Sequence, residues 1–142
     1  MSLADDDVVL GVLRSAHANL EVYDGDVRLS DADRLAKVIS VPLPYLVFHS
    51  APGSDRAQSL AGTSGARLLT FRVTFVGGSR EEAKAASEIA EGVLKEQVLS
   101  FPAGERLVTR TDNNLPVRRD DAWTRPQGKP LFYGVDEYVV LT

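Results

Sequence analysis

The sequence contains no cysteine. Disulfide bonds, thiolate zinc sites and cysteine nucleophiles are therefore excluded, and the composition fits a reducing cytoplasm. No stretch approaches the roughly 20 consecutive apolar residues that a membrane-spanning helix needs. The first residues, MSLADDD, are acidic, whereas a secretory signal begins basic and continues apolar. We therefore expect a soluble intracellular protein.

An excess of basic residues is also missing. The formal net charge is −4 and the pI is about 5.1, which argues against a general nucleic-acid-binding protein. The 142 residues suit one compact domain spanning residues 1–142. Apolar residues make up 44% of the chain and charged residues 25%, so a hydrophobic core is expected.

Candidate catalytic and metal-binding groups are few. The only histidines are His17 and His49, and no Gly-x-Ser-x-Gly motif accompanies them. The acidic run at residues 5–7 is better explained as helix-capping charge than as a cation site. The Asp-Asn-Asn run at 112–114 lacks the remaining positions of a calcium loop, and the paired glycines at 77–78 lack the spacing of a phosphate-binding loop. We therefore predict no enzyme activity, no cofactor and no metal.

Apolar periodicity predicts two main helices. Val9, Leu13 and Leu20 follow helical spacing within residues 5–20. The second helix is predicted to begin at a capping box formed by Ser79 and Glu82 and to carry an apolar stripe up to Gln97, with a stop at the following proline and glycine. Residues 30–40 have a weak pattern that fits either a short helix or a linker.

Strands are predicted where apolar and polar residues alternate or β-branched residues cluster. The clearest alternation covers residues 69–75, and residues 45–50 are expected to pair with it as a long antiparallel hairpin. The intervening residues 51–66 are small and polar and predict a flexible connection. Further strands are predicted at residues 106–111, 115–120 and 131–141. The resulting fold class is α+β, a two-layer sandwich with two helices packed on a mostly antiparallel sheet.

Candidate partner-binding residues lie in two connections. Residues 117–121 (VRRDD) lead through an irregular loop at 121–130 into the aromatic closing strand, which includes residues 132–138 (FYGVDEY). A tryptophan in such a loop either folds back onto the core or anchors a partner, and we weigh these equally. The charged run is interpreted as a solvated or interfacial salt-bridge cluster. The predicted partner-binding residues are Arg56, Gln58, Arg118, Arg119, Asp120 and Trp123.

The order and spacing of several short segments resemble one family. These segments are residues 23–25 (YDG), 42–47 (PLPYLV), 69–77 (LTFRVTFVG), 80–83 (REEA), 117–121 and 132–138, preceded by the amphipathic helix. Together they look like the tail terminator, or tail completion, proteins of long-tailed bacteriophages and prophages. The resemblance covers nearly the whole chain, although each segment alone is short and degenerate.

The resemblance implies a virion assembly protein without catalytic residues. It implies a homo-hexameric ring that caps the head-proximal end of the tail tube, stops polymerisation of the tube protein and presents a surface to the head-completion or connector protein. Genomic DNA would pass through the lumen without specific binding, and an acidic chain suits that passage. The implied location is the tail of the virion, with the host cytoplasm as the place of assembly.

Three alternatives remain open from the sequence. The chain fits another head–tail connector protein, such as a stopper or an adaptor, although adaptors are usually dominated by helices. A small hydrolase or transferase using His49 with nearby carboxylates belongs to a different class. A monomeric ligand-binding module with a pocket between sheet and helices is the third alternative.

Overall fold

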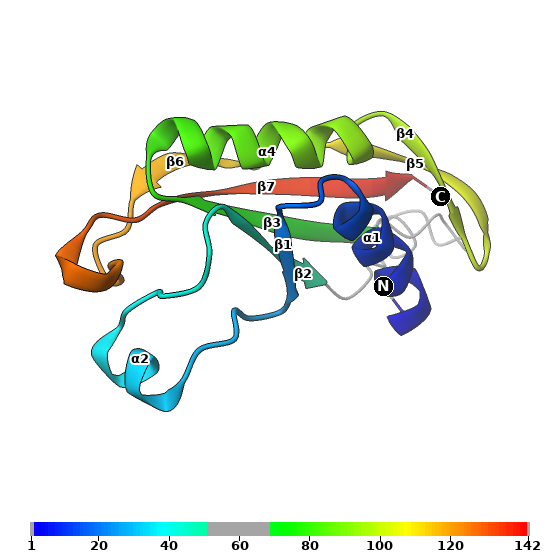
Figure 1. Cartoon of the computed structure of the whole chain (residues 1–142). Helices are drawn as coiled ribbons and strands as arrows, with labels where there is room; N and C mark the ends of the chain where they lie inside the picture. Colours follow the sequence, from blue (N-terminus) through cyan, green and yellow to red (C-terminus); the bar gives the residue numbers. More distant parts are fainter. Residues whose placement is uncertain (1, 51–68, 142) are drawn as a thin grey trace, which may run out of the picture.

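The structure is a computed structural model that describes residues 2–50 and 69–141. Within these ranges, seven strands form one sheet (Figure 1). Six of them follow the order β1-β2-β3-β7-β5-β4. The seventh, β6, pairs with the first half of β7, while β5 pairs with the second half. All strand pairs are antiparallel except β1 with β2. The strands are β1 (Glu21–Asp24), β2 (Tyr45–Ser50), β3 (Leu69–Gly77), β4 (Gln97–Phe101), β5 (Gly104–Arg110), β6 (Leu115–Arg119) and β7 (Phe132–Leu141).

Two helices cover one face of this sheet, which confirms the predicted α+β class. Helix α4 (Arg80–Leu94) lies along β3 and β7. Helix α1 (Leu3–Ser15) contacts both β1 and β4, which are strands at opposite ends of the sheet, so the sheet curls around α1 (Figure 1). A short helix, α2 (Asp31–Ala36), lies away from the sheet in the segment between β1 and β2, and a 3-10 turn spans Pro126–Gly128.

The main core fills the space between the sheet and these two helices. Three aromatic rings from adjacent strands form its centre, since Phe71 contacts Phe48 and Tyr138 with ring centroids 5.5 Å and 5.4 Å apart. Three small side chains of α4 face these strands: Ala83, Ala86 and Ala90 are essentially fully buried. Their size lets the helix lie close to the sheet, as the alanine-rich stripe predicted.

A second, smaller core lies against the other face of the sheet at one end. It contains Tyr45, Val47 and Val76 from the strands, together with side chains of the segment between β1 and β2 and of the connection between β6 and β7. The remainder of that face carries no helix within the described ranges, and no described helix is long and apolar enough to span a membrane.

Local sequence explains the start of α4. The Ser79 hydroxyl accepts a hydrogen bond from the Glu82 N–H at 3.1 Å, as predicted, but the Glu82 carboxylate accepts from the N–H of Gly78 at 2.8 Å, one residue before the position predicted for a capping box. A side chain at Gly77 would lie 2.5 Å from the backbone nitrogen of Ala83. Gly77 is therefore needed for the close strand-to-helix junction.

Two strands were not predicted: β4 lies where the second helix was expected to continue, and β1 directly follows the range predicted for the first helix. Helix α1 ends at Ser15, and residues 21–24 form β1 because they pair in parallel with β2. Helix α4 ends at Leu94, Glu96 adopts a left-handed conformation with φ 56°, and Gln97 begins β4 as an exposed residue. The predicted helical positions of Leu20 and Gln97 were therefore wrong: α1 has already ended at Ser15, and Gln97 pairs with Val108 of β5.

The other predicted elements agree with the structure. Strands β2, β3, β5, β6 and β7 lie within a few residues of their expected ranges, and the weak pattern at 30–40 contains α2. Strands β2 and β3 pair antiparallel as expected. The predicted flexible connection at residues 51–66 lies outside the described residues.

Candidate functional site

The connection between β6 and β7 is organised by Asp120. One of its carboxylate oxygens, Oδ1, accepts hydrogen bonds from the N–H groups of Ala122 at 2.9 Å and Trp123 at 3.0 Å. Its own N–H donates to the carbonyl of Leu131 at 2.8 Å. Asp120 therefore forms a turn of the type common for aspartate, and a contact of its carboxylate with a partner stays a prediction.

The indole of Trp123 is half-buried and packs against the second core. It forms part of the wall of a hollow of about 220 Å³ that Val27, Ile39, Tyr45 and Leu131 also line. The next residue, Thr124, is held to the segment between β1 and β2, since its carbonyl accepts the N–H of Ile39 at 2.8 Å. Of the two interpretations of this tryptophan, packing onto the core is confirmed, while contact with a partner stays a prediction.

The two arginines of β6 do not form one basic spot. Arg118 pairs with Tyr133 of β7 and Arg119 pairs with Phe132. Since successive side chains of a strand point to opposite faces, the two guanidinium groups lie on opposite faces of the sheet. Both residues are exposed, and among the described residues no ion pair joins either one to Asp120 or Asp121.

The other predicted partner residues, Arg56 and Gln58, lie outside the described residues. The structure therefore brings Asp120 and Trp123 together at one end of the sheet and separates Arg118 from Arg119. Whether any of the six contacts a partner stays a prediction.

The histidines lie apart. His17 follows α1, and its Nδ1 accepts the backbone N–H of Asn19 at 3.2 Å. His49 lies on β2 opposite Arg72 of β3. Burial lowers the pKa of His49 and the charge of Arg72 lowers it further, while nearby aspartates raise it. The described residues contain no group of three or more metal-ligating side chains placed to hold an ion.

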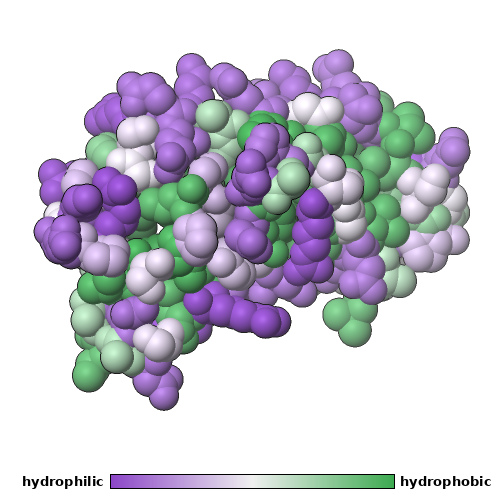
Figure 2. Space-filling view, in the orientation of Figure 1, coloured by the Kyte–Doolittle hydropathy of each residue, from purple (hydrophilic) through white to green (hydrophobic). Residues whose placement is uncertain are grey.

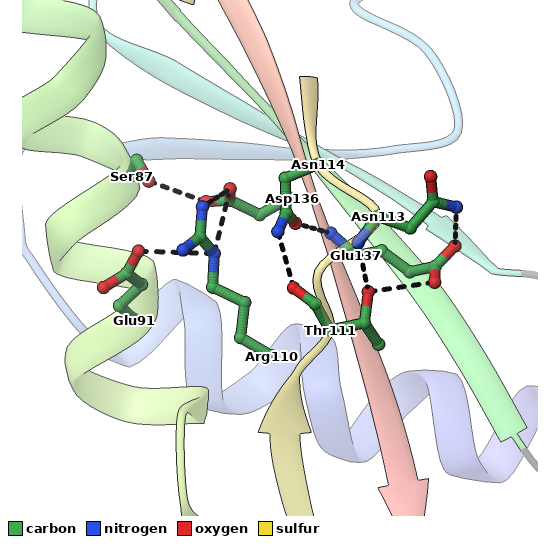
Figure 3. Close-up of polar contacts among 8 residues, drawn as sticks. All are labelled: Ser87, Glu91, Arg110, Thr111, Asn113, Asn114, Asp136 and Glu137. Carbon is green, nitrogen blue, oxygen red and sulfur yellow. Dashed lines mark hydrogen bonds and ion pairs between the residues drawn. The ribbon is translucent and has the colours of Figure 1, made fainter. Parts of the chain in front are cut away.

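A buried polar network lies under α4 (Figure 3). Asp136 of β7 is only 2% exposed. Its Oδ1 accepts hydrogen bonds from Nη2 and Nε of Arg110 at 2.7 Å and 3.2 Å, and its Oδ2 accepts from the Ser87 hydroxyl at 2.6 Å. Glu91 of α4 lies 3.5 Å from the same guanidinium. Burial alone lowers the pKa of Arg110, but the hydrogen bonds and charge of Asp136 raise it overall.

This network joins α4 to β5 and β7. Both oxygens of the buried carboxylate have partners, which is the condition for a charge to be tolerated inside a protein. The hydroxyl of Tyr138, which follows two residues later on the same face, is buried without a hydrogen-bond partner among the described residues. Burial raises the pKa of Tyr138, and the charge of Asp136 raises it further. The Ser87 hydroxyl of α4 and the Arg110 guanidinium of β5 both donate to Asp136, so the network holds these elements together.

The neighbouring residue, Glu137, organises the opposite face (Figure 3). Its carboxylate accepts hydrogen bonds from the Thr111 hydroxyl at 3.0 Å and from the Asn113 amide at 3.1 Å, and Arg72 lies 3.4 Å away. The Asn114 side chain accepts the N–H of Glu137 at 2.8 Å. These contacts fix the connection between β5 and β6, which the sequence correctly predicted as a turn, onto β7.

An apolar row lies on the face of the sheet that carries no helix. Val98 of β4 pairs with Leu107 of β5, and Leu107 pairs with Leu141 of β7. Their exposed fractions are 60%, 38% and 41%. We call these three side chains the open-face row. Sequence reasoning missed it because the second helix was predicted to continue past Val98, so the pairing of Val98 with Leu107 was not expected.

Comparisons with known proteins give a likeness of fold. No protein-family model matches the chain, and no curated protein matches it in sequence. Among solved structures, a chain of the "Virion of native gene transfer agent (GTA) particle" matches with a TM-score of 0.50 and 15% sequence identity. The match covers 98% of this chain and 87% of that chain. At this identity the likeness shows the fold alone.

Proposed function

We propose that this chain is a structural subunit of a phage-like particle, and specifically a tail terminator. In this proposal, six copies of the single domain form a ring on the head-proximal end of the tail tube. The ring stops further addition of the tube protein and presents the surface to which the head-completion or connector protein binds. The protein acts by contact and has no enzymatic role.

One observation carries the proposal. The fold of nearly the whole chain is similar to that of a chain from a virion particle. The segments that resemble tail terminator proteins support the same choice, since they are spread from the amphipathic helix to the closing strand. These two lines of support are separate. The resemblance depends on the order and spacing of short sequence segments, whereas the fold comparison was made with a chain that shares only 15% sequence identity.

The described surface is compatible with ring assembly. The open-face row leaves three large apolar side chains in water, and burial of apolar area is the main favourable term in protein association. A closed ring also requires each subunit to offer two different surfaces, one to each neighbour. The net charge of −4 suits a lumen that DNA crosses without binding, because phosphate contacts depend on Lys and Arg.

The decisive experiment deletes this gene in the parent phage or prophage and measures tail-tube length by negative-stain electron microscopy. Overlong tubes without heads are expected, and complementation with the intact gene should restore the normal length. Tubes of normal length that fail to join heads would assign the protein to the connector instead. Intact infectious particles would contradict any assembly role.

The passage of DNA is tested separately. Exposed acidic residues that face the lumen in a reconstructed ring are replaced by lysine, and DNA ejection is measured in the resulting particles. Slower or incomplete ejection at low salt is expected, since added cations bind phosphate. Unaltered ejection would remove electrostatic repulsion from the proposal and leave the capping role in place.

A further inference from the structure

The hollow beside Trp123 is enclosed by three separate parts of the chain. Its walls come from the segment between β1 and β2, from the strands β2, β3 and β7, and from the β6–β7 connection. Figure 1 places α2 and the β6–β7 connection at this end of the molecule, and Figure 2 shows hydrophobic atoms at the surface between them. The volume of about 220 Å³ is below the roughly 300–1,000 Å³ of pockets for drug-sized ligands. The hollow therefore suits a compact group.

Three aromatic side chains belong to its wall. Tyr45 of β2 and Tyr133 of β7 are both aligned with Val76 of β3, so the two rings lie on the same face of the sheet. Trp123 joins them from the β6–β7 connection. Tyr45 is only 4% exposed, and the other two rings are half-buried. The faces of tyrosine and tryptophan rings attract cations, most strongly where water is partly excluded.

The charge of the wall is negative. Two carboxylates, Asp26 and Asp120, and one guanidinium, Arg34, line the hollow, which gives a formal charge of −1. Arg34 is paired with Asp26 at 3.1 Å. Asp120 uses Oδ1 for the two N–H groups of its turn, and no hydrogen bond among the described residues reaches its Oδ2. Arg118 pairs with Tyr133 in the sheet but does not line the hollow. Asp120 thus supplies the uncompensated charge.

The hydroxyl of Tyr45 is a further polar group of this wall. Burial raises the pKa of Tyr45, and the charges of Tyr23, Asp120 and Asp26 raise it further. The hydroxyl is therefore neutral at ordinary pH and lies close to both carboxylates. Within the described residues it makes no hydrogen bond, although the side chain is almost completely buried. A phenolic oxygen in this position is free to accept a hydrogen bond from a ligand N–H or O–H.

From this arrangement we propose that the hollow binds a compact organic ammonium ion, held by Oδ2 of Asp120 and by the faces of Tyr45, Tyr133 and Trp123. Aromatic rings around an anionic group are the usual means of recognising such cations. The ammonium group belongs either to a free small molecule or to a lysine side chain of a partner protein. The site is complete within one copy of the chain, so the inference does not depend on the proposed ring.

The chain provides its own probe for this site, because Trp123 is its only tryptophan. The full-length protein is titrated with choline while tryptophan fluorescence is recorded, with sodium chloride added to keep the ionic strength constant. A saturable change with a dissociation constant of about 1 mM is expected for so small a ligand. The neutral analogue 3,3-dimethylbutan-1-ol, which has carbon in place of the charged nitrogen, should bind about ten-fold more weakly.

Two variants test the charge and the rings separately. Asp120→Asn keeps an oxygen that can accept the two N–H groups of the turn but removes the charge, and it should weaken choline binding about ten-fold. Asp121→Asn is the matched control, since Asp121 is exposed and does not line the hollow, and it should leave binding unchanged. Tyr133→Leu keeps the wall apolar without a ring face. It should weaken choline binding about three-fold to ten-fold and leave binding of the neutral analogue unchanged.

A second ligand identifies the source of the ammonium group. N-acetyl-lysine methylamide carries a lysine side chain without a peptide charge at either end. If it binds more tightly than choline, the site takes a lysine of a partner protein, whereas tighter binding of choline indicates a free small molecule.

Three results would overturn the inference. They are no saturable change with either ammonium compound, equal affinity for choline and its neutral analogue, and an equal loss of affinity in Asp120→Asn and Asp121→Asn. Circular dichroism of each variant shows whether it is folded, and Tyr133→Leu keeps the test available if Asp120→Asn is not. None of these results depends on tail-tube length, so the proposed function stands or falls on the gene deletion alone.

Discussion

The two faces of the central sheet carry different kinds of side chain, although the same strands supply both. On the face beneath α1 and α4, the aromatic cluster around Phe71 and the carboxylate of Asp136 are almost completely buried. On the other face, the second core occupies one end and the open-face row remains exposed at the other. One face thus holds the subunit together, while the other leaves apolar area for a neighbour.

Adjacent residues of β7 show the same division. Asp136 is buried between Arg110 and Ser87, whereas Glu137 points away and holds a surface connection. Both carboxylates accept several hydrogen bonds, but only that of Asp136 is buried in the main core. The comparison shows that single strands of this sheet bury one side in the main core and leave part of the other side exposed, and the following changes test how differently the two sides contribute to stability.

The largest expected effect comes from the aromatic cluster. Phe71→Ala removes a fully buried ring that contacts Phe48 and Tyr138. It should lower the free energy of unfolding by about 3–5 kcal/mol. The matched change Val139→Ala lies half-exposed on the other face and should cost less than about 1 kcal/mol, close to the range for surface substitutions. Urea unfolding measures both, and equal losses would contradict the division between faces.

The next effect concerns the buried charge. Asp136→Ala leaves the Arg110 guanidinium without its main partner, and breaking a buried ion pair typically costs about 3–5 kcal/mol. Since the Arg110 side chain is 32% exposed, we expect about 3 kcal/mol. Glu137→Ala should cost about 1–2 kcal/mol, because it removes hydrogen bonds near the surface. Thermal and urea unfolding of the two variants, with Arg110→Met/Asp136→Leu as a charge-free reference, would show whether the neighbours differ.

A smaller effect is expected at the start of α4. Ser79→Ala removes the hydroxyl that accepts the Glu82 N–H, and loss of such a cap costs about 1 kcal/mol. The replacement Ser79→Asp keeps an acceptor and should restore stability. If Ser79→Ala also weakened oligomer formation at constant stability, α4 would belong to the assembly surface and the assignment of roles to faces would need revision.

The smallest effect depends on pH. Burial raises the pKa of Asp6 in α1, although a hydrogen bond from Ser50 lowers it. A raised carboxyl pKa means that folding favours the protonated form, so this stabilisation is fully present below the ordinary pKa and is lost as the pH rises through the folded value. Asp6→Asn should therefore raise the melting temperature slightly at pH 7 and give no gain near pH 3. Asp7→Asn, an exposed neighbour in the same helix, controls for the loss of one negative charge.

The sequence predicted those elements whose pattern is local. The alternation in β3 and the alanine stripe of α4 follow directly from which faces are buried. Strands β1 and β4 were missed because they are short and form only by pairing with β2 and β5. A pattern within the chain does not show a partner strand that lies elsewhere in the sequence.

The candidate site was only partly predictable, for the same reason. Period-two alternation in residues 115–120 already indicates that Arg118 and Arg119 point to opposite faces, so this correction was available from the sequence. Asp136 also interrupts an inward-facing set of small and apolar residues, which signals a buried carboxylate that needs partners. Its partners Ser87 and Arg110 are separated from it by 49 and 26 residues, and no local signal identifies them.

The position of β7 in the sheet has a consequence for biosynthesis. It is the last of the described strands in sequence, and it alone joins the hairpin of β2 and β3 to the hairpin of β4 and β5. Until the ribosome has released Leu141, the β2–β3 hairpin and the β4–β5 hairpin cannot pair into one sheet. Completion of the sheet therefore depends on contacts between residues distant in sequence, which slow folding. A nascent chain in which β7 is incomplete therefore lacks the complete sheet.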